Sequence, residues 1–376
     1  MKFLHIADLH IGKMLHKFSM LDDQRKMLAE LREIAHTEQV DAVLIAGDVY
    51  QRNTPAPEAM TAFSDFLAGL VEDKLPVYLI SGNHDSAERV AYLSEIARIS
   101  GVYIAPPDCT QVTSYPLQDA FGELEIHLLP FCTPMEVRRR YPDSNIETYQ
   151  DAVGEVLRHH RVDTQKRNIL VCHQFLVGAS VCDSEELAIG GLDAVSSDLF
   201  AQYDYVALGH LHGPQQVGRE TVRYAGSPLK YSFSERTQKK SAAIVDIQEK
   251  GHIIVKTVPI HQPHEMTELR GTFDELMQEP SRMDFTSIVL TDEFPPPDAL
   301  RRLRTIFPNL LVLRIENSKM SEERLIDVEE RQQQDMMTLL RDFYAMQNQG
   351  AGLTETQEKL AISIFEQMDA EGSDAL

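Results

Sequence analysis

Five short segments of this sequence contain residue types that bind metal ions or transfer protons. They are Asp8-Leu9-His10, Gly47-Asp48, Gly82-Asn83-His84-Asp85, Cys172-His173-Gln174 and Gly209-His210-Leu211-His212. Asp8 and His10 are two positions apart, so on an extended segment both side chains project to one side and can hold one ion. His210 and His212 repeat this spacing. Carboxylate, amide and imidazole ligands suit Mn²⁺, iron or Zn²⁺ better than Mg²⁺, which prefers oxygen and water.

Each segment taken alone also has a purely structural explanation. A single aspartate after a strand, such as Asp48, is usually a turn or helix-cap residue. A single histidine such as His173 is more often a satisfied core residue. Chance placement of polar residues rarely repeats this pattern at five places, and a carboxylate such as Asp48 can bridge two ions ~3.5–4 Å apart. The set therefore predicts a two-metal site for phosphoester chemistry.

The segments follow apolar runs that predict buried β-strands. The predicted strands are Lys2–Ile6, Ala42–Ala46, Val77–Ser81, Ile169–Cys172 and Tyr205–Leu208. Their continuous apolar character suits burial on both faces of a sheet. Open α/β sheets place their chemistry at the carboxyl ends of such strands. The sequence therefore predicts an α/β fold that carries the polar segments on its strand ends.

Helical spacing of apolar residues predicts the elements between these strands. The predicted helices are Met20–Gln39, Pro57–Glu72, Ala87–Ile99 and Glu147–Arg161, and Ala242–Ile247 with Ile253–Ile260 should form a closing hairpin. We expect three regions: a catalytic domain over residues 1–264, a small α/β domain over 265–320, and a linker with two amphipathic helices over 321–376.

Composition limits the class of protein. The chain has 376 residues, of which 58 are acidic and 36 basic, giving a net charge of −22. That balance argues against a large basic surface, although bound cations can still attract a nucleic acid locally. No apolar run approaches the ~20 residues that span a membrane, so we expect a cytoplasmic protein. The four cysteines form no CxxC pair and are expected to be reduced.

The order of these motifs resembles the calcineurin-like metallophosphoesterase superfamily over roughly the first 260 residues. Further segments resemble the narrower family of bacterial SbcD nuclease subunits: Gly178-Ala179-Ser180, Tyr224-Ala225-Gly226-Ser227-Pro228 and Ser232-Phe233-Ser234-Glu235. The resemblance implies a four-layer α/β/β/α sandwich, a small α/β capping domain and a C-terminal helical pair. It also implies two divalent ions, usually manganese.

The resemblance assigns roles to particular residues. One ion would be held by Asp8, His10, Asp48 and His212, and the other by Asp48, Asn83, His173 and His210. His84 would contact the scissile phosphate and help to protonate the leaving oxygen, and Asp85 would orient the His84 ring. After Gly47-Asp48-Val49-Tyr50 the family usually has Asp or His where this chain has Gln51, which cannot titrate.

The resemblance further implies an exonuclease and endonuclease that acts on DNA in repair, recombination and replication. It would work as a homodimer within a heterotetramer, with an SbcC-type ABC ATPase whose coiled-coil base receives the terminal helices. Packing of those helices on their own chain is the alternative. Two other functions remain open: a small-molecule or cyclic-nucleotide phosphodiesterase on the same core, and a non-catalytic scaffold that tethers DNA ends.

Basic clusters are candidates for phosphate contacts, with a solvated surface as the equal alternative. They are Arg138-Arg139-Arg140, Lys239-Lys240, and Arg301, Arg302 and Arg304 on a predicted helix. Several histidines lack the strand-end context and are expected to be surface or packing residues. These are His16, His36, His127, His159, His160, His261 and His264.

Overall fold

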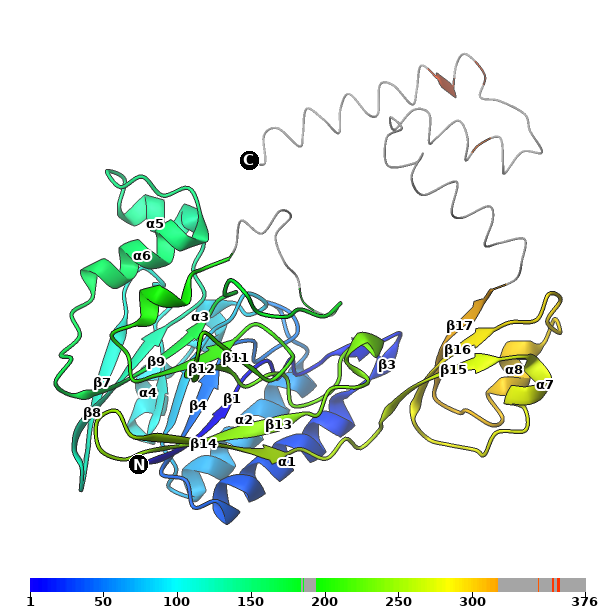
Figure 1. The fold of residues 1–376 in the computed structure, drawn as a ribbon, viewed down its shortest axis with the longest axis horizontal. Helices are drawn as coiled ribbons and strands as arrows, with labels where there is room; N and C mark the ends of the chain where they lie inside the picture. Colours follow the sequence, from blue (N-terminus) through cyan, green and yellow to red (C-terminus); the bar gives the residue numbers. More distant parts are fainter. Residues whose placement is uncertain (184, 186–193, 317–343, 345–353, 355–356, 359–376) are drawn as a thin grey trace. The chain divides into compact units, whose positions relative to one another are not determined.

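The computed structural model describes residues 1–183, 185, 194–316, 344, 354, 357 and 358, and its chain divides into two compact units (Figure 1). Among the described residues, the first unit comprises those within Met1–Glu268, Ser281–Ser287 and Phe307–Val312, and the second those within Leu269–Pro280 and Ile288–Ile306 and from Leu313 onward. The boundary near residue 264 remains a prediction. The predicted linker and terminal helical pair lie almost wholly outside the described residues.

Two six-stranded sheets form the centre of the first unit. In spatial order the first contains β14 (Ile253–Pro259), β13 (Ser241–Ile247), β1 (Lys2–Ile6), β4 (Ala42–Ala46), β5 (Val77–Ile80) and β6 (Val102–Ile104). The second contains β11 (Gln215–Val217), β12 (Arg219–Tyr224), β10 (Tyr205–Gly209), β9 (Arg167–His173), β8 (Gly122–Leu129) and β7 (Thr113–Asp119). Strand β1 pairs in parallel with β4 and antiparallel with β13, so the predicted hairpin closes the first sheet beside β1.

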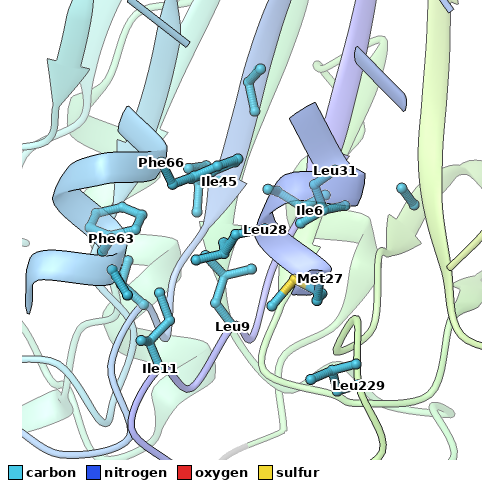
Figure 2. Close-up of a cluster of buried hydrophobic side chains, with 14 of the residues drawn as sticks. Ile6, Leu9, Ile11, Met27, Leu28, Leu31, Ile45, Phe63, Phe66 and Leu229 are labelled. Atoms are coloured by element: carbon cyan, nitrogen blue, oxygen red, sulfur yellow. The ribbon is translucent and has the colours of Figure 1, made fainter. Parts of the chain in front are cut away.

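Helices cover the outer face of the first sheet. Helices α1 (Leu21–Thr37) and α2 (Pro57–Glu72) direct an apolar stripe onto it. Figure 2 shows the resulting cluster, in which the labelled side chains include Met27, Leu28, Leu31, Phe63 and Phe66 from the helices and Ile6 and Ile45 from the strands. This burial is the main reason that these amphipathic segments are helical, because packing contributes more to helix stability than propensity does.

Alternate residues of the strands enter different cores. In β5, Val77 and Leu79 join the helical core, whereas Tyr78 and Ile80 join a second core between the two sheets. In β9, Ile169 enters that central core while its alternating neighbours pack beneath α5 (Pro134–Arg140) and α6 (Tyr149–His159). Both sheets are therefore buried on both faces, which explains the continuous apolar runs. The four-layer α/β/β/α arrangement of the first unit is confirmed.

The predicted single helix over Ala87–Ile99 is wrong. The segment forms two short helices, α3 (Ala87–Val90) and α4 (Ser94–Ile99), separated by Leu93 in the left-handed conformation at φ 61°. Helix α4 contains no buried residue, so little packing stabilises a continuous helix here. Strand β7 and helix α5 were not predicted from the sequence. Strand β7 lies at the sheet edge and contains no fully buried residue, and it therefore lacks an apolar signature.

The C-terminal part of the described chain contains a small sheet with two short helices. Strands β15 (Met266–Gly271), β16 (Phe285–Leu290) and β17 (Leu310–Ile315) form this sheet, with β16 in the middle. Helices α7 (Phe273–Leu276) and α8 (Ala299–Leu303) accompany it, and α8 is shorter than the predicted helix near 297–307. Among the described residues, no helix has the length and apolar character needed to cross a membrane.

A buried histidine between the sheets makes the fold sensitive to acid. Nδ1 of His5 lies 2.9 Å from the Tyr205 hydroxyl, and its Nε2 lies 3.2 Å from the Leu208 carbonyl oxygen. Burial lowers the pKa of His5 to about 3, against an ordinary value near 6.5. Below pH 6.5, His5 therefore binds a proton in the unfolded chain but not in the folded chain. The free energy of unfolding consequently falls as the pH falls.

We expect the unfolding free energy of the metal-free chain to drop by about 2 kcal/mol between pH 6.5 and 4.5 through His5 alone. Urea unfolding of the wild type and of His5→Asn at both pH values measures this contribution. The variant should be less stable at pH 7 but should lose less stability on acidification. Equal losses in both proteins would refute the assignment to His5.

Candidate metal centre

The seven predicted ligands come together at the carboxyl ends of strands from both sheets. Asp8 and His10 follow β1, Asp48 follows β4 and Asn83 follows β5. His173 ends β9, and His210 and His212 follow β10. Six of these side chains are at most 7% exposed, and Asn83 is half-buried. The topology thus gathers residues up to 204 positions apart into one buried polar cluster.

The ligand atoms fall into groups small enough to surround a cation. Atoms of Asp8, His10 and His212 lie within 4.8 Å of one another, and so do atoms of Asp8, Asp48 and His173. One carboxylate oxygen of Asp48, Oδ2, lies 3.6 Å from Nε2 of His10 and 3.4 Å from Nε2 of His173. Asp48, a member of the second group, therefore also faces His10 of the first, and Asp8 belongs to both groups.

Asn83 completes the second group. Its Oδ1 lies 3.0 Å from Nε2 of His173 and 2.9 Å from Nδ1 of His210. Nδ1 of His173 lies 2.8 Å from the carbonyl oxygen of Ala46, which fixes the ring with Nε2 directed toward Asn83 and Asp48. One amide oxygen and two imidazole nitrogens thus converge beside the Asp48 carboxylate.

Four of the predicted ligands have a left-handed backbone. The φ angles are 54° at Asp8, 45° at His10, 49° at Asp48 and 103° at His210. Residues other than glycine rarely adopt this conformation, and it persists where the surrounding structure holds it in place. Here the loops hold one another: the amide of His10 donates to the Asp48 carbonyl, and the amide of His210 donates to Oδ1 of Asp8. Strain concentrated on these residues is typical of a functional site.

Two glycines are required because other atoms approach them closely. A Cβ on Gly82 would lie 2.2 Å from Oδ1 of Asp48, and a Cβ on Gly209 would lie 1.8 Å from the carbonyl oxygen of Ala46. Neither glycine has a left-handed backbone. The glycines therefore allow the strand ends of the two sheets to meet, and Gly82 serves close packing against Asp48 in addition to starting the loop.

The donor set fits divalent cations. Oδ2 of Asp8 is fully buried without a hydrogen-bond partner in the described chain, and Nε2 of His10 and Nε2 of His212 lie only 3.0 Å apart. Burial raises the pKa of Asp8 well above its usual range. Although burial alone would lower it, the Asp48 carboxylate raises the pKa of His173 to about 9. Two buried carboxylates close together repel one another, and a bound divalent cation would compensate their negative charge. The cluster is therefore suited to bind a cation.

His84 lies beside this cluster. Its amide donates to Oδ1 of Asp48 at 2.9 Å, and its half-buried ring meets the His10 ring edge to face, with the centroids 4.8 Å apart. A nitrogen of this ring also lies within 4.8 Å of ligand atoms of His10 and Asp48. His84 thus lies next to the candidate ligands and remains partly accessible.

Asp85 has contacts that differ from its predicted role. Its carboxylate accepts hydrogen bonds from the amides of Val49 at 3.1 Å, Tyr50 at 2.9 Å and Gly82 at 3.0 Å. Burial raises the pKa of this carboxyl group to about 6. Within the described chain, both oxygens thus bind backbone amides rather than the His84 ring. Asp85 fastens the loop after β4 to the loop after β5 and so places Asp48 and His84 together.

Several residues that support the ligands were not predicted from the sequence. Gln24 is fully buried on α1; its side-chain amide donates to the carbonyl oxygen of His10 at 2.8 Å, and its Oε1 accepts from the Gly12 amide. The Tyr231 ring packs edge-on against the rings of His10 and His212. Nothing in a helical glutamine or a loop tyrosine marks it in sequence as part of a site.

Two further polar residues have environments that the sequence did not indicate. Lys240 is fully buried in an ion pair with Glu235, so it is not a contact for an external phosphate. Oε1 of Gln51 is buried and has no hydrogen-bond partner in the described chain.

Comparison with known proteins agrees with this geometry. Residues 1–214 match the family described as calcineurin-like phosphoesterase, and residues 262–348 match the SbcD C-terminal family, described as type 5 capsule protein repressor C-terminal domain. The chain is 33% identical to the D subunit of nuclease SbcCD from Staphylococcus epidermidis, with 92% of each chain covered. It is 32% identical to the protein of the same name from Staphylococcus saprophyticus, over 99% of this chain and 100% of that one.

A crystal structure of a dimetal phosphatase from Danio rerio is a weaker match, at 11% identity and a TM-score of 0.41, covering 69% of this chain and 98% of that one. At that TM-score the likeness adds no weight. The sequence matches extend over both parts of the chain, and the strand-end ligand cluster lies within the first of them. The chain therefore belongs to the calcineurin-like phosphoesterase family of metal-dependent hydrolases and, within it, to the family of SbcD nuclease subunits.

Proposed function

We propose that this chain is a Mn²⁺-dependent DNA nuclease that hydrolyses phosphodiester bonds at a two-metal site. The observation that supports this function most strongly is the convergence of seven buried or half-buried candidate ligand side chains, Asp48 among them, in one cluster. The name of its relatives, which are called the D subunit of nuclease SbcCD, supports a nucleic acid as the substrate. Mn²⁺ is the ion that we propose, in line with the family resemblance; the mixed imidazole, carboxylate and amide ligands suit Mn²⁺, iron or Zn²⁺ better than Mg²⁺.

The ligands divide into two sets that share one carboxylate. Asp8, His10, Asp48 and His212 would hold one cation, and Asp48, Asn83, His173 and His210 would hold the other. Two divalent cations at such sites activate water as a nucleophile and stabilise the entering and leaving oxygens of the phosphate. The buried setting strengthens these electrostatic effects because water screens them less.

His84 would act on the substrate directly. Its ring is partly accessible, and its backbone is fixed by the hydrogen bond from its amide to Asp48. We propose that its imidazole binds the scissile phosphate and donates a proton to the leaving oxygen. Asp85 would contribute indirectly, by holding the two loops that carry His84 and Asp48.

We propose further that the chain works with an SbcC-type ATPase in DNA end processing and repair in the cytoplasm. The match of residues 262–348 to the SbcD C-terminal family and the full-length similarity to SbcD subunits support this partnership. The capping role of residues 265–320 and the docking role of the terminal helical pair belong to the same proposal. Exposed arginines at the end of α5, Arg138, Arg139 and Arg140, are available for phosphate contacts.

A homodimer within a heterotetramer is part of this proposal. Around α4, four large apolar side chains are 52–86% exposed: Tyr92, Leu93, Ile96 and Ile99. They adjoin a groove of about 400 Å³ whose lining includes Met60 and Tyr92. Exposed apolar surface of this kind marks an interaction site, and a second copy of the chain is the occupant that the proposal requires.

Hydrolysis assays with contrasting substrates test the proposed function. The purified chain should degrade linear double-stranded DNA with Mn²⁺, lose that activity on chelation and regain it when Mn²⁺ is restored. Plasmid and single-stranded circular DNA would separate endonuclease from exonuclease activity. Rapid cleavage of bis(p-nitrophenyl) phosphate or a cyclic nucleotide, with no cleavage of DNA, would favour the small-molecule phosphodiesterase. DNA binding with no hydrolysis of any substrate would favour the tethering scaffold.

A further inference from the structure

A buried ion pair lies directly behind one of the proposed metal ligands. Glu235 and Lys240 are both fully buried, and the Lys240 ammonium donates to Oε2 of Glu235. The other carboxylate oxygen, Oε1, lies 3.4 Å from Nδ1 of His212. Buried ion pairs contribute little net stability, because desolvation of the two charges offsets their attraction. The contact with His212 therefore matters more than the pair itself.

We infer that Glu235 is a positioning residue that orients His212 with its Nε2 lone pair toward the metal pocket. When Nδ1–H of His212 donates to Glu235, the opposite ring nitrogen is left without a proton. That nitrogen, Nε2, lies 3.0 Å from Nε2 of His10, in the same group of potential ligand atoms as Asp8. A carboxylate behind a ligating imidazole fixes its tautomer and ring orientation. The inference rests on the proposed two-metal function.

The carboxylate of Glu235 is itself held rigidly. Oε1 also accepts from the amide of Tyr231 at 3.2 Å, and Oε2 accepts from the Ser227 hydroxyl at 3.4 Å. Lys240 reaches beyond Glu235 to the carbonyl oxygen of His212, at 2.8 Å. Glu235 thus contacts the ring of His212, and Lys240 contacts its backbone carbonyl group. Thermal motion of this ligand should be small even before a cation binds.

This support acts on one metal position. On the proposed function, His212 belongs to the set with Asp8 and His10, on the side where Glu235 lies. In the other set, the ring of His173 is oriented by the carbonyl oxygen of Ala46, at 2.8 Å from Nδ1. Loss of Glu235 should therefore weaken the binding of one cation and leave the other nearly unchanged.

The test compares two double variants that both remove the buried charges. Glu235→Leu/Lys240→Met removes the acceptor for His212, whereas Glu235→Gln/Lys240→Met keeps a neutral acceptor oxygen at the same position. Isothermal titration with Mn²⁺ measures the affinity of each step, and thermal melting with a chelator present measures folding. We expect the leucine variant to bind one of two ions about 10- to 100-fold more weakly, with a smaller loss in the glutamine variant.

The possible outcomes distinguish failure of the role inferred for Glu235 from failure of the proposed two-metal function. If the wild type binds no Mn²⁺, the proposed function itself fails. If the wild type binds two ions and the folded leucine variant binds both with unchanged affinity, the role of Glu235 is refuted while the function stands. Equal weakening of both ions, in proportion to the loss of melting temperature, would show a general structural role and would also overturn the inference. A Lys240→Met single variant that still folds should retain most of the affinity, because Glu235 still accepts from His212.

Discussion

Replacement of His84 by alanine is expected to lower DNA hydrolysis by about 10²- to 10⁴-fold while both Mn²⁺ ions remain bound. The imidazole is removed from the accessible side of the cluster, but the backbone amide that donates to Asp48 is unchanged. The seven proposed ligands also keep their positions, so metal affinity should change little. Single-turnover hydrolysis of linear DNA and Mn²⁺ titration of the same preparation together measure both effects.

The control for this variant is His261→Ala, which removes an exposed histidine on the same unit, outside the ligand cluster. It should leave both hydrolysis and metal binding unchanged. A nitrogen of the His84 ring lies within 4.8 Å of possible ligand atoms of His10 and Asp48, so these three residues could together hold an ion. Loss of one Mn²⁺ from His84→Ala would therefore identify His84 as a ligand and would contradict the proton-donor role.

The substitution Asp48→Asn should lower the rate of DNA hydrolysis by at least about 10³-fold. The reason is that the variant should lose at least one of the two bound ions. Oδ2 of Asp48 faces both His10 and His173, so the variant removes the carboxylate that we propose to be shared by the two metal sets. Loss of a carboxylate that joins two ions also removes their common charge compensation. Asparagine preserves the shape of the side chain and an oxygen that can accept from the His84 amide, so the fold should persist.

Mn²⁺ stoichiometry, measured by titration or by elemental analysis after gel filtration, distinguishes this result from simple misfolding. Asp65→Asn, on the exposed surface of α2, is the matched control and should bind two ions. Two tightly bound ions in a folded Asp48→Asn protein would refute the shared position of Asp48. Circular dichroism of the metal-free proteins provides the required evidence of folding.

The strand-end ligands were predictable because each motif depends on local information. A buried strand followed by a loop places Asp48 or His173 at a sheet edge whatever the rest of the fold does. The same reasoning predicted the central strands and the helices α1 and α2, whose apolar periodicity is strong. The pairing of His10 with His212, which are 202 positions apart, was expected only from the resemblance to the metallophosphoesterase superfamily.

The residues whose contacts the sequence did not indicate depend on tertiary structure. Asp85 could be placed in a loop, but its three backbone donors belong to segments that only the folded sheet brings near. Lys240 and Lys239 look alike in sequence, although only Lys240 enters the core to meet Glu235. Leu93 interrupts the predicted helix because its backbone is left-handed. No glycine or proline is present at this position to indicate the break in the sequence.

The place of β1 between β4 and β13 has a consequence for synthesis of the chain. A ribosome delivers β1 first, but its antiparallel neighbour β13 ends only at Ile247. At a synthesis rate of 5–20 residues per second, the edge of β1 that pairs with β13 would stay unpaired for roughly 10 to 50 s. An unpaired strand edge is prone to aggregation during such an interval. A nascent chain of this protein should therefore associate with chaperones until the hairpin of β13 and β14 emerges, and should gain tight metal binding only after that point.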